Sequence, residues 1–185
     1  MSKIVLLSKK EKIINHRSIK NNYGSYSFVR YFLGDNHEID AEFHRLKKKY
    51  GLVFFSLFIV DERRKIKYYF SSDESWNDYY IKNNLINYDH LYRHAFSIVN
   101  FKEESIKLVY WDSCPLLTPE SKDVDAERKL VGKYSNGYGL VYRKGKYVEI
   151  SGFGGNVDDK FFSAKMPIYE TQKLVSMTRF MMVGL

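Results

Sequence analysis

Apolar positions recur along the chain with two different periods, and each period predicts a type of secondary structure. Over residues 37–50, the apolar residues Ile39, Phe43 and Leu46 follow one another at steps of four and three, which places them on one face of a helix. Gly51 comes directly afterwards, and a glycine at this position typically ends a helix because it adopts the left-handed backbone conformation at little cost. The pattern therefore predicts an amphipathic helix that ends before this glycine.

Runs of β-branched and aromatic residues predict about five strands, most of them in two hairpins. LVFFSLFIV and KIKYYFS, joined by the charged DERR, form the first hairpin. Its first strand is almost wholly apolar, so we expect it to be central or buried on both faces. YGLVYR and KYVEISGF form the second hairpin around the turn at 143–146, and IKLVYW at 106–111 predicts a further strand.

Helices are expected between and after these strands. Two short helices are predicted near 73–84 and 89–97. A third lies in TPESKDVDAERKLVGKY, where Thr118 has the side chain of an N-cap and Pro119 occupies the first helical position. Pro167 opens a long C-terminal helix.

The order of these elements predicts an α+β fold, namely an α-β-α sandwich with a central, mostly antiparallel sheet of about five strands. We expect a single domain over residues 1–185, because the chain shows no linker, internal repeat or low-complexity segment. Residues 1–36 are expected to form a helical or irregular N-terminal lead-in, and residues 37–183 the core of the domain.

The composition indicates a folded domain but does not determine which kind of molecule the domain binds. Hydrophobic residues make up 44% of the chain, and the 16 Tyr and 13 Phe suit a sheet that lines a small-molecule cavity. A Lys/Asn/Ile/Tyr-rich genome explains the same excess of aromatic residues equally well. The formal charge of +8 permits a nucleic acid or another anionic partner. The basic residues are scattered in short runs, however, and solvated surfaces explain them at least as well.

Cysteine usage and hydropathy predict the compartment. Cys114 is the single cysteine, so we expect no internal disulfide and no cysteine-based metal cluster, as is typical of a reducing cytosol. The apolar run near the start is too short for a signal peptide, and no stretch approaches the roughly 18 apolar residues of a membrane span. We therefore expect a soluble, cytoplasmic protein without a membrane partner.

The sequence carries no recognisable catalytic or metal-binding motif, so we expect a protein that is not an enzyme and has no cofactor. His90 and His94 are four residues apart, but no third ligand lies near them in the sequence, and surface positions are the better interpretation. Cys114 has no identifiable base beside it, and the GxSxG motif is absent. The glycine-rich SGFGGN at 151–156 lacks the GKS/T ending of a phosphate loop, which favours a turn after the last strand.

One polar, Asn-rich segment carries the candidate site. Trp76 and Tyr80 are four residues apart and share a face of their helix, and Asp89 follows the helix break. A buried aspartate needs a hydrogen-bond donor, and an amide N–H of a ligand would serve. Two alternatives need no ligand: the aromatic rings fill the core, and Asp89 is the N-cap of the next helix.

The spacing W-x3-Y-x8-D resembles the signal-binding domain of LuxR-type quorum-sensing transcription regulators. The flanking passages EFHRLKKKYGLVFFSLFIV, DHLYRHAF, LVYW and VGKYSNGYGLVYRKGKYVEIS also resemble this family. The similarity covers roughly residues 37–183, which it identifies as a signal-binding core. It implies an autoinducer-binding, PAS/GAF-like sandwich that holds an N-acyl-homoserine lactone between the sheet and the helices.

The resemblance also implies roles for five residues. Trp76 would donate its indole N–H to the lactone carbonyl, and Asp89 would accept from the ligand amide. Tyr80 and Trp111 would pack against the ligand, and Ser151 would hydrogen-bond to it from the last strand. The implied partners are the small-molecule signal and a second regulator subunit, in a homodimer or a heterodimer.

Several departures separate this chain from an ordinary member of the family, and one of them is an interval from Asp89 to Trp111 that is longer than usual. Ser72 stands where the family usually has Tyr, and His90 stands where it usually has Pro after the Asp. Residues 160–185 predict one helix and no helix-turn-helix unit, so DNA would be reached only through a domain that this chain does not contain. A ligand-free interaction or dimerisation module that modulates a full-length regulator or another partner is the alternative interpretation.

Overall fold

The computed structural model describes residues 26–99 and 104–184. Residues 1–25 of the expected lead-in lie outside the described residues. Six strands form one sheet in the order β1-β3-β2-β6-β5-β4. The β1–β3 pair is parallel, and the other neighbouring pairs are antiparallel. The strands are β1 (Ser27–Phe32), β2 (Leu52–Asp61), β3 (Ile66–Ser71), β4 (Ser105–Tyr110), β5 (Tyr134–Lys144) and β6 (Tyr147–Asn156).

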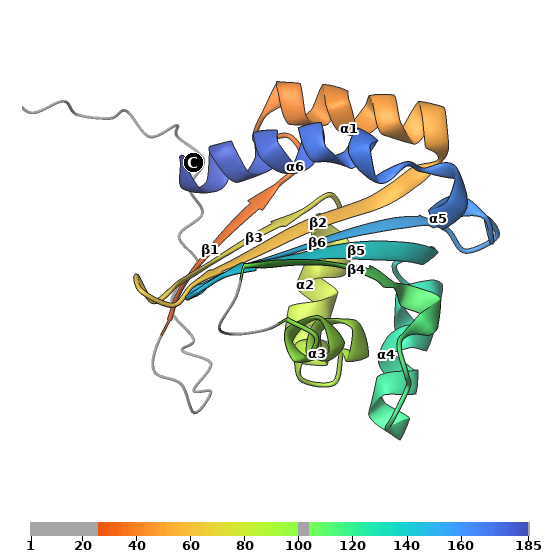
Figure 1. The fold of residues 1–185 in the computed structure, drawn as a ribbon. Helices are drawn as coiled ribbons and strands as arrows, with labels where there is room; N and C mark the ends of the chain where they lie inside the picture. The colour runs from red at the N-terminus through yellow and green to blue at the C-terminus, as the bar shows by residue number, and fades with distance from the viewer. Residues whose placement is uncertain (1–25, 100–103, 185) are drawn as a thin grey trace, which may run out of the picture.

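Helices cover both faces of this sheet (Figure 1). The helices α1 and α6 lie on one face, and α2, α3 and α4 lie on the opposite face. The expected α-β-α sandwich with a mostly antiparallel sheet is therefore confirmed. The helices are α1 (His37–Tyr50), α2 (Glu74–Lys82), α3 (His90–Ser97), α4 (Pro119–Leu130), α5 (Phe162–Lys165) and α6 (Ile168–Val183), with short 3₁₀ turns η1 (Leu85–Asn87) and η2 (Trp111–Ser113).

Two expectations about the strands were wrong. The segment Ser27–Phe32, expected as part of an irregular lead-in, is the edge strand β1, which pairs with β3 over its whole length. The glycine-rich SGFGGN, expected as a turn, continues the strand β6 as far as Asn156. In both cases, the backbone hydrogen bonds come from a strand distant in sequence, which local patterns do not report.

The helix ends follow the expected capping chemistry. Gly51 ends α1 in the left-handed conformation, with φ at 80°. Thr118 accepts from the backbone N–H of Ser121, whose hydroxyl closes a reciprocal capping box on α4. Pro167 immediately precedes α6, as predicted.

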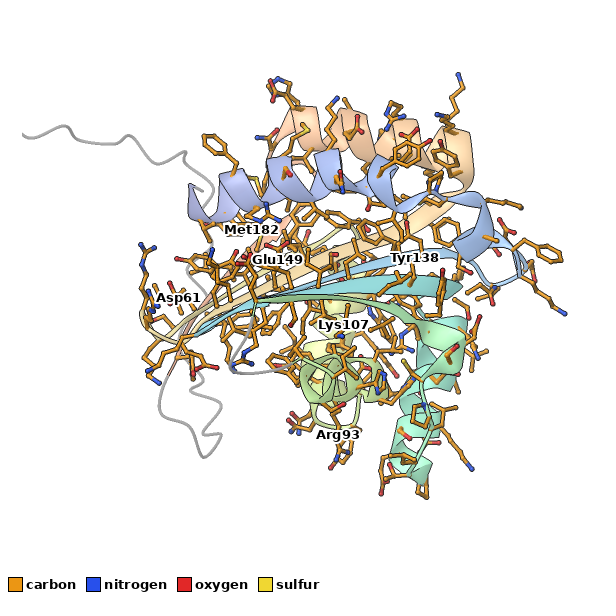
Figure 2. The ribbon with its side chains drawn as sticks, viewed as in Figure 1. Asp61, Arg93, Lys107, Tyr138, Glu149 and Met182 are labelled. Carbon is orange, nitrogen blue, oxygen red and sulfur yellow. The ribbon has the colours of Figure 1, made fainter. Side chains whose placement is uncertain are left out.

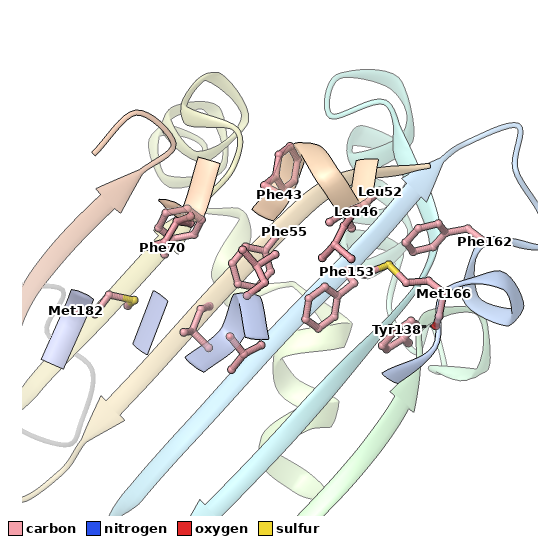
Figure 3. Close-up of a cluster of buried hydrophobic side chains, with 14 of the residues drawn as sticks. Phe43, Leu46, Leu52, Phe55, Phe70, Tyr138, Phe153, Phe162, Met166 and Met182 are labelled. Carbon is pink, nitrogen blue, oxygen red and sulfur yellow. Dashed lines mark hydrogen bonds between the residues drawn. The ribbon is translucent and has the colours of Figure 1, made fainter. Parts of the chain in front are cut away.

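The apolar core lies between the sheet and the α1/α6 layer (Figure 3). Phe55 of β2 is completely buried there, and its ring lies 5.4 Å from that of Phe70 and 5.2 Å from that of Phe153. Phe43 and Leu46 of α1 pack into the same cluster. These apolar side chains fill the central part of the space between the sheet and the two helices.

Among the described residues, the helices are too short or too polar for any of them to traverse a bilayer.

Candidate functional site

A cavity of about 130 Å³ lies between the sheet and the α2/α3/α4 layer. Its wall includes all five residues that the resemblance implied: Trp76, Tyr80, Asp89, Trp111 and Ser151. They come from α2, the N-cap of α3, η2 and β6, so only the packing of the layers brings them to one place.

The helix α2 carries the aromatic part of the wall. Asp73 is its N-cap and accepts from the backbone N–H of Trp76 at 2.9 Å. Trp76 and Tyr80 share the inward face, with ring centroids 5.8 Å apart, and Trp76 is only 3% exposed. The edge of the Trp76 ring meets Tyr134 of β5 at 5.9 Å, which is a favourable perpendicular contact.

Asp89 caps α3 and faces the cavity at the same time. Its Oδ1 accepts from the backbone N–H of Leu91 at 2.8 Å and from Nη2 of Arg128 at 3.1 Å. Its Oδ2 accepts from the Tyr80 hydroxyl at 2.7 Å. The capping role and a site role therefore coexist, because Oδ2 has one donor and can accept a second hydrogen bond.

Arg128, which the sequence analysis did not predict as part of the site, places a buried positive charge in the wall. It is 4% exposed, and its Nη1 also lies 3.2 Å from Oδ1 of Asp125. Its guanidinium carbon stands 5.8 Å from the centroid of the Trp111 ring, within cation–π range. One sequence pattern could have found it: Val124 and Arg128 are four apart on α4, which puts an arginine on the buried stripe of that helix.

Burial and pairing set the protonation of these groups. Burial alone would raise the pKa of Asp89, but the Arg128 guanidinium and the Tyr80 hydroxyl outweigh it, so the pKa lies below its usual value. Burial and the Asp89 charge raise the pKa of Tyr80 well above 10. Asp89 and Arg128 are therefore both charged at neutral pH, and Tyr80 is a neutral donor.

His90 shows a further departure from expectation. It was expected at the surface, but it is buried, and no described residue pairs with its Nδ1. Burial, followed by the nearby charge of Arg128, lowers the pKa of His90. Among the described residues, no group of three or more His, Cys, Asp or Glu is arranged to hold a metal ion.

Trp111 lies on a floor of glycines from β5 and β6. A Cβ at Gly137 would lie 2.6 Å from the Trp111 ring, and one at Gly154 would lie 3.0 Å from it. Gly139 and Gly152 border the same ring. These glycines make room for a large indole against the sheet, which explains why the last strands are rich in glycine.

Several polar groups of the wall are unpaired. Within the described residues, the indole N–H groups of Trp76 and Trp111 and the Tyr134 hydroxyl make no hydrogen bond. Buried tryptophan and tyrosine side chains usually find such partners. The residues that line the cavity thus carry several donors without a hydrogen bond and one partly free acceptor, Asp89 Oδ2.

The Ser151 hydroxyl does not join this group. Residues paired across antiparallel strands share a face, and Ser151 pairs with Leu57 and Leu140. Leu57 belongs to the core under α1 and α6. Glu149, two residues earlier, points to the same layer and pairs with Arg179 of α6 at 2.6 Å (Figure 2). Ser151 therefore borders the cavity through its backbone, and its hydroxyl lies 3.4 Å from the Leu140 carbonyl oxygen.

Ser72 has a structural role at the position where the resemblance suggested a lost ligand contact. Its hydroxyl accepts from the backbone N–H of Phe55 at 2.8 Å. This hydrogen bond connects the segment after β3 to β2, so the Ser72 hydroxyl already has a partner within the protein.

No protein-family model and no curated protein matches this chain.

Proposed function

We propose that this protein is a signal-binding domain that holds a small amphiphilic amide, of the N-acyl-homoserine lactone class, between the sheet and the α2/α3/α4 layer. In this proposal it belongs to a LuxR-type regulator or to a relative that lacks the helix-turn-helix domain. The observation that carries the proposal is a set of donors without a hydrogen bond among the described residues, led by the Trp76 indole N–H, on side chains that line one cavity together with Asp89.

The hydrogen-bonding groups of the cavity complement an acylated amide. The indole N–H groups of Trp76 and Trp111 suit carbonyl oxygens, and Asp89 Oδ2 suits an amide N–H. A charged acceptor in a dry site makes a strong hydrogen bond. Asp89 and Arg128 already neutralise each other, which favours an uncharged ligand because a further buried charge would lack a partner.

The size of the cavity limits the ligand. At about 130 Å³ it is smaller than the roughly 300–1,000 Å³ typical of drug-sized pockets. We therefore expect a compact head group with a short acyl part, unless α2 and α3 move outward on binding.

Binding of this kind would act through the stability of the fold. A ligand that binds only the folded state adds RT ln(1 + [L]/Kd), about 2.7 kcal/mol at a hundredfold excess over Kd. Folded domains are typically stable by only about 5–15 kcal/mol. A signal could thus control the survival of the domain and its pairing with another subunit.

A thermal-shift titration with N-butanoyl-homoserine lactone tests the proposal. We expect a saturable rise in Tm that is weakened in Trp76→Phe, which keeps an aromatic ring and loses the N–H, and in Asp89→Asn, which keeps a capping oxygen. Ser151→Ala is the matched control, because its hydroxyl faces the other layer. No shift with any short-chain member of the series, or an equal shift in Trp76→Phe, would refute the proposal.

The alternative, an interaction module, is favoured by the opposite face of the sheet. Ile106, Leu108 and Tyr110 of the edge strand β4 are exposed, Ile106 by 70%. A hollow of about 790 Å³ beside them is bordered by α6 and by the basic side chains of Lys144 and Arg179. If no lactone shifts Tm while Ile106→Lys abolishes self-association in sedimentation equilibrium, this second function replaces the first.

A further inference from the structure

Asn77 is a buried carboxamide without a partner in the wall of the same cavity. It is 1% exposed, and no described residue makes a hydrogen bond with its Oδ1 or its Nδ2. It follows Trp76 on α2 and precedes Tyr80 and Ile81, and all four residues line the cavity. Asn77 therefore belongs to the face of α2 that is turned toward the site.

The position of Asn77 separates it from the charged end of the cavity. The next residue, Asp78, pairs at 2.9 Å with Arg30 of β1, which is one edge of the sheet. The Trp111 ring lies over the glycines of β5 and β6, and Arg128 stands beside it. Asn77 takes no part in the Asp89–Arg128 pair, so the wall carries a second polar group apart from that pair.

An unpaired carboxamide at this buried position destabilises the folded protein when no ligand is bound. Each buried polar atom without a hydrogen bond loses the solvation that water supplied in the unfolded chain. A leucine has the same number of side-chain atoms in the same branched arrangement and leaves no polar atom unpaired. An asparagine at such a position is explained if a bound molecule supplies the missing donor and acceptor.

We infer that Asn77 is a specificity-determining residue for a ligand end that carries a hydrogen-bond donor and an acceptor side by side, as a primary carboxamide, a lactam or a cyclic imide does. Such a group forms two parallel hydrogen bonds with the asparagine amide. The inference rests on the proposed function, because it requires a ligand in the cavity. It makes the ligand polar at both ends, whereas an ordinary acyl chain ends in an alkyl group.

Two probes of matched shape test the inference. N-succinamoyl-homoserine lactone ends in a carboxamide, and N-(4-methylpentanoyl)-homoserine lactone ends in an isopropyl group of the same size. Both are titrated by calorimetry into the wild-type protein and into Asn77→Leu, and the melting temperature of each unliganded protein is recorded. Asn77→Asp is not suitable, because it would add a buried charge.

The expected result is a reversal of preference. The wild-type protein binds the carboxamide probe at least tenfold more tightly than the isopropyl probe. Each hydrogen bond contributes about 1 kcal/mol, and two such bonds correspond to a tenfold or larger difference in affinity. Asn77→Leu prefers the isopropyl probe, and without ligand it melts at or above the wild-type temperature.

Four other outcomes would overturn the inference. If the isopropyl probe binds the wild-type protein as tightly as the carboxamide probe does, a trapped water satisfies Asn77, and the proposed function survives alone. The role of Asn77 is also refuted, and the proposed function survives, if Asn77→Leu keeps the preference for the carboxamide probe or melts well below the wild-type protein. If neither probe binds the wild-type protein, the proposed function fails for this ligand class, and the role of Asn77 fails with it.

Discussion

Replacing Arg128 with methionine should show how much the buried Arg128–Asp89 ion pair contributes to the stability of the fold. Arg128 and Asp89 form a buried ion pair at 3.1 Å, with side-chain exposures of 4% and 11%. Removing one partner of such a pair typically costs about 3–5 kcal/mol, because the other charge stays buried and uncompensated. Asp89 keeps the Tyr80 hydroxyl and backbone N–H donors, so we expect the lower end, about 3 kcal/mol.

Urea unfolding followed by tryptophan fluorescence measures this loss, since both indoles border the site. Adding Asp89→Asn to Arg128→Met should recover much of the stability, because the neutral amide needs no cation and still caps α3. Lys129→Met is the matched control: Lys129 lies on the same helix and pairs with Asp125, but it is 47% exposed. Exposed pairs contribute little, so we expect a change of less than about 1 kcal/mol.

The pH dependence provides a signature that a packing defect would not show. In the wild-type protein the pKa of Asp89 is lowered below 3.8, so the pair stabilises the fold above that value and the contribution is lost as pH falls through the lowered pKa. In Arg128→Met, burial dominates and raises the pKa of Asp89 above its unfolded value. The folded variant then binds the proton first and regains stability as pH falls from 7 toward 4. A deficit that is small at pH 7, or constant with pH, would refute this account.

Four further predictions follow from the same geometry. Gly137→Ala should lower the free energy of unfolding in urea by about 3 kcal/mol and Gly152→Ala by about 1 kcal/mol, because the new Cβ would collide with the Phe153 carbonyl oxygen in the first and meet the Ser56 hydroxyl at 3.1 Å in the second. Equal losses would contradict the role of these glycines in making room for Trp111. The lowered pKa of His90 means that the unfolded chain takes up the proton first, so stability should fall as pH drops through about 6.5, and His90→Gln should flatten this slope in pH-dependent melts. Thr118→Ala should lower the unfolding free energy by about 1 kcal/mol through loss of the capping box, as measured by circular dichroism. Burial raises the pKa of Cys114 to about 11, so the native thiol should resist Ellman's reagent at pH 8 while the urea-unfolded protein reacts at once.

Local chemistry made much of the secondary structure readable from the sequence. The caps at Thr118 and Gly51 and the shared face of Trp76 and Tyr80 depend on residues within one or two helical turns. The hairpins depend on alternation and short turns. These features are decided by backbone hydrogen bonds between near neighbours, which is why a sequence pattern predicts them.

The candidate site was predictable in part. Trp76, Tyr80, Asp89 and Trp111 were expected together, and the fold brings them to one cavity. Ser151 was expected with them, but its strand register turns the hydroxyl to the other layer. A shift of one residue in register reverses every side chain of a strand, and the choice is made by pairing with distant strands.

Tertiary structure alone decided which groups lie beside the buried polar and charged side chains of the cavity. The partner of Asp89 lies 39 residues away on α4, the room for Trp111 comes from glycines on two other strands, and the empty hydrogen-bonding positions of Asn77 exist only because the layers enclose it. The physical reason is that a buried charge or amide is satisfied by whichever group the packed layers place beside it. Sequence neighbours determine which way a side chain leaves its helix, and the packing of helices on the sheet determines what it meets there.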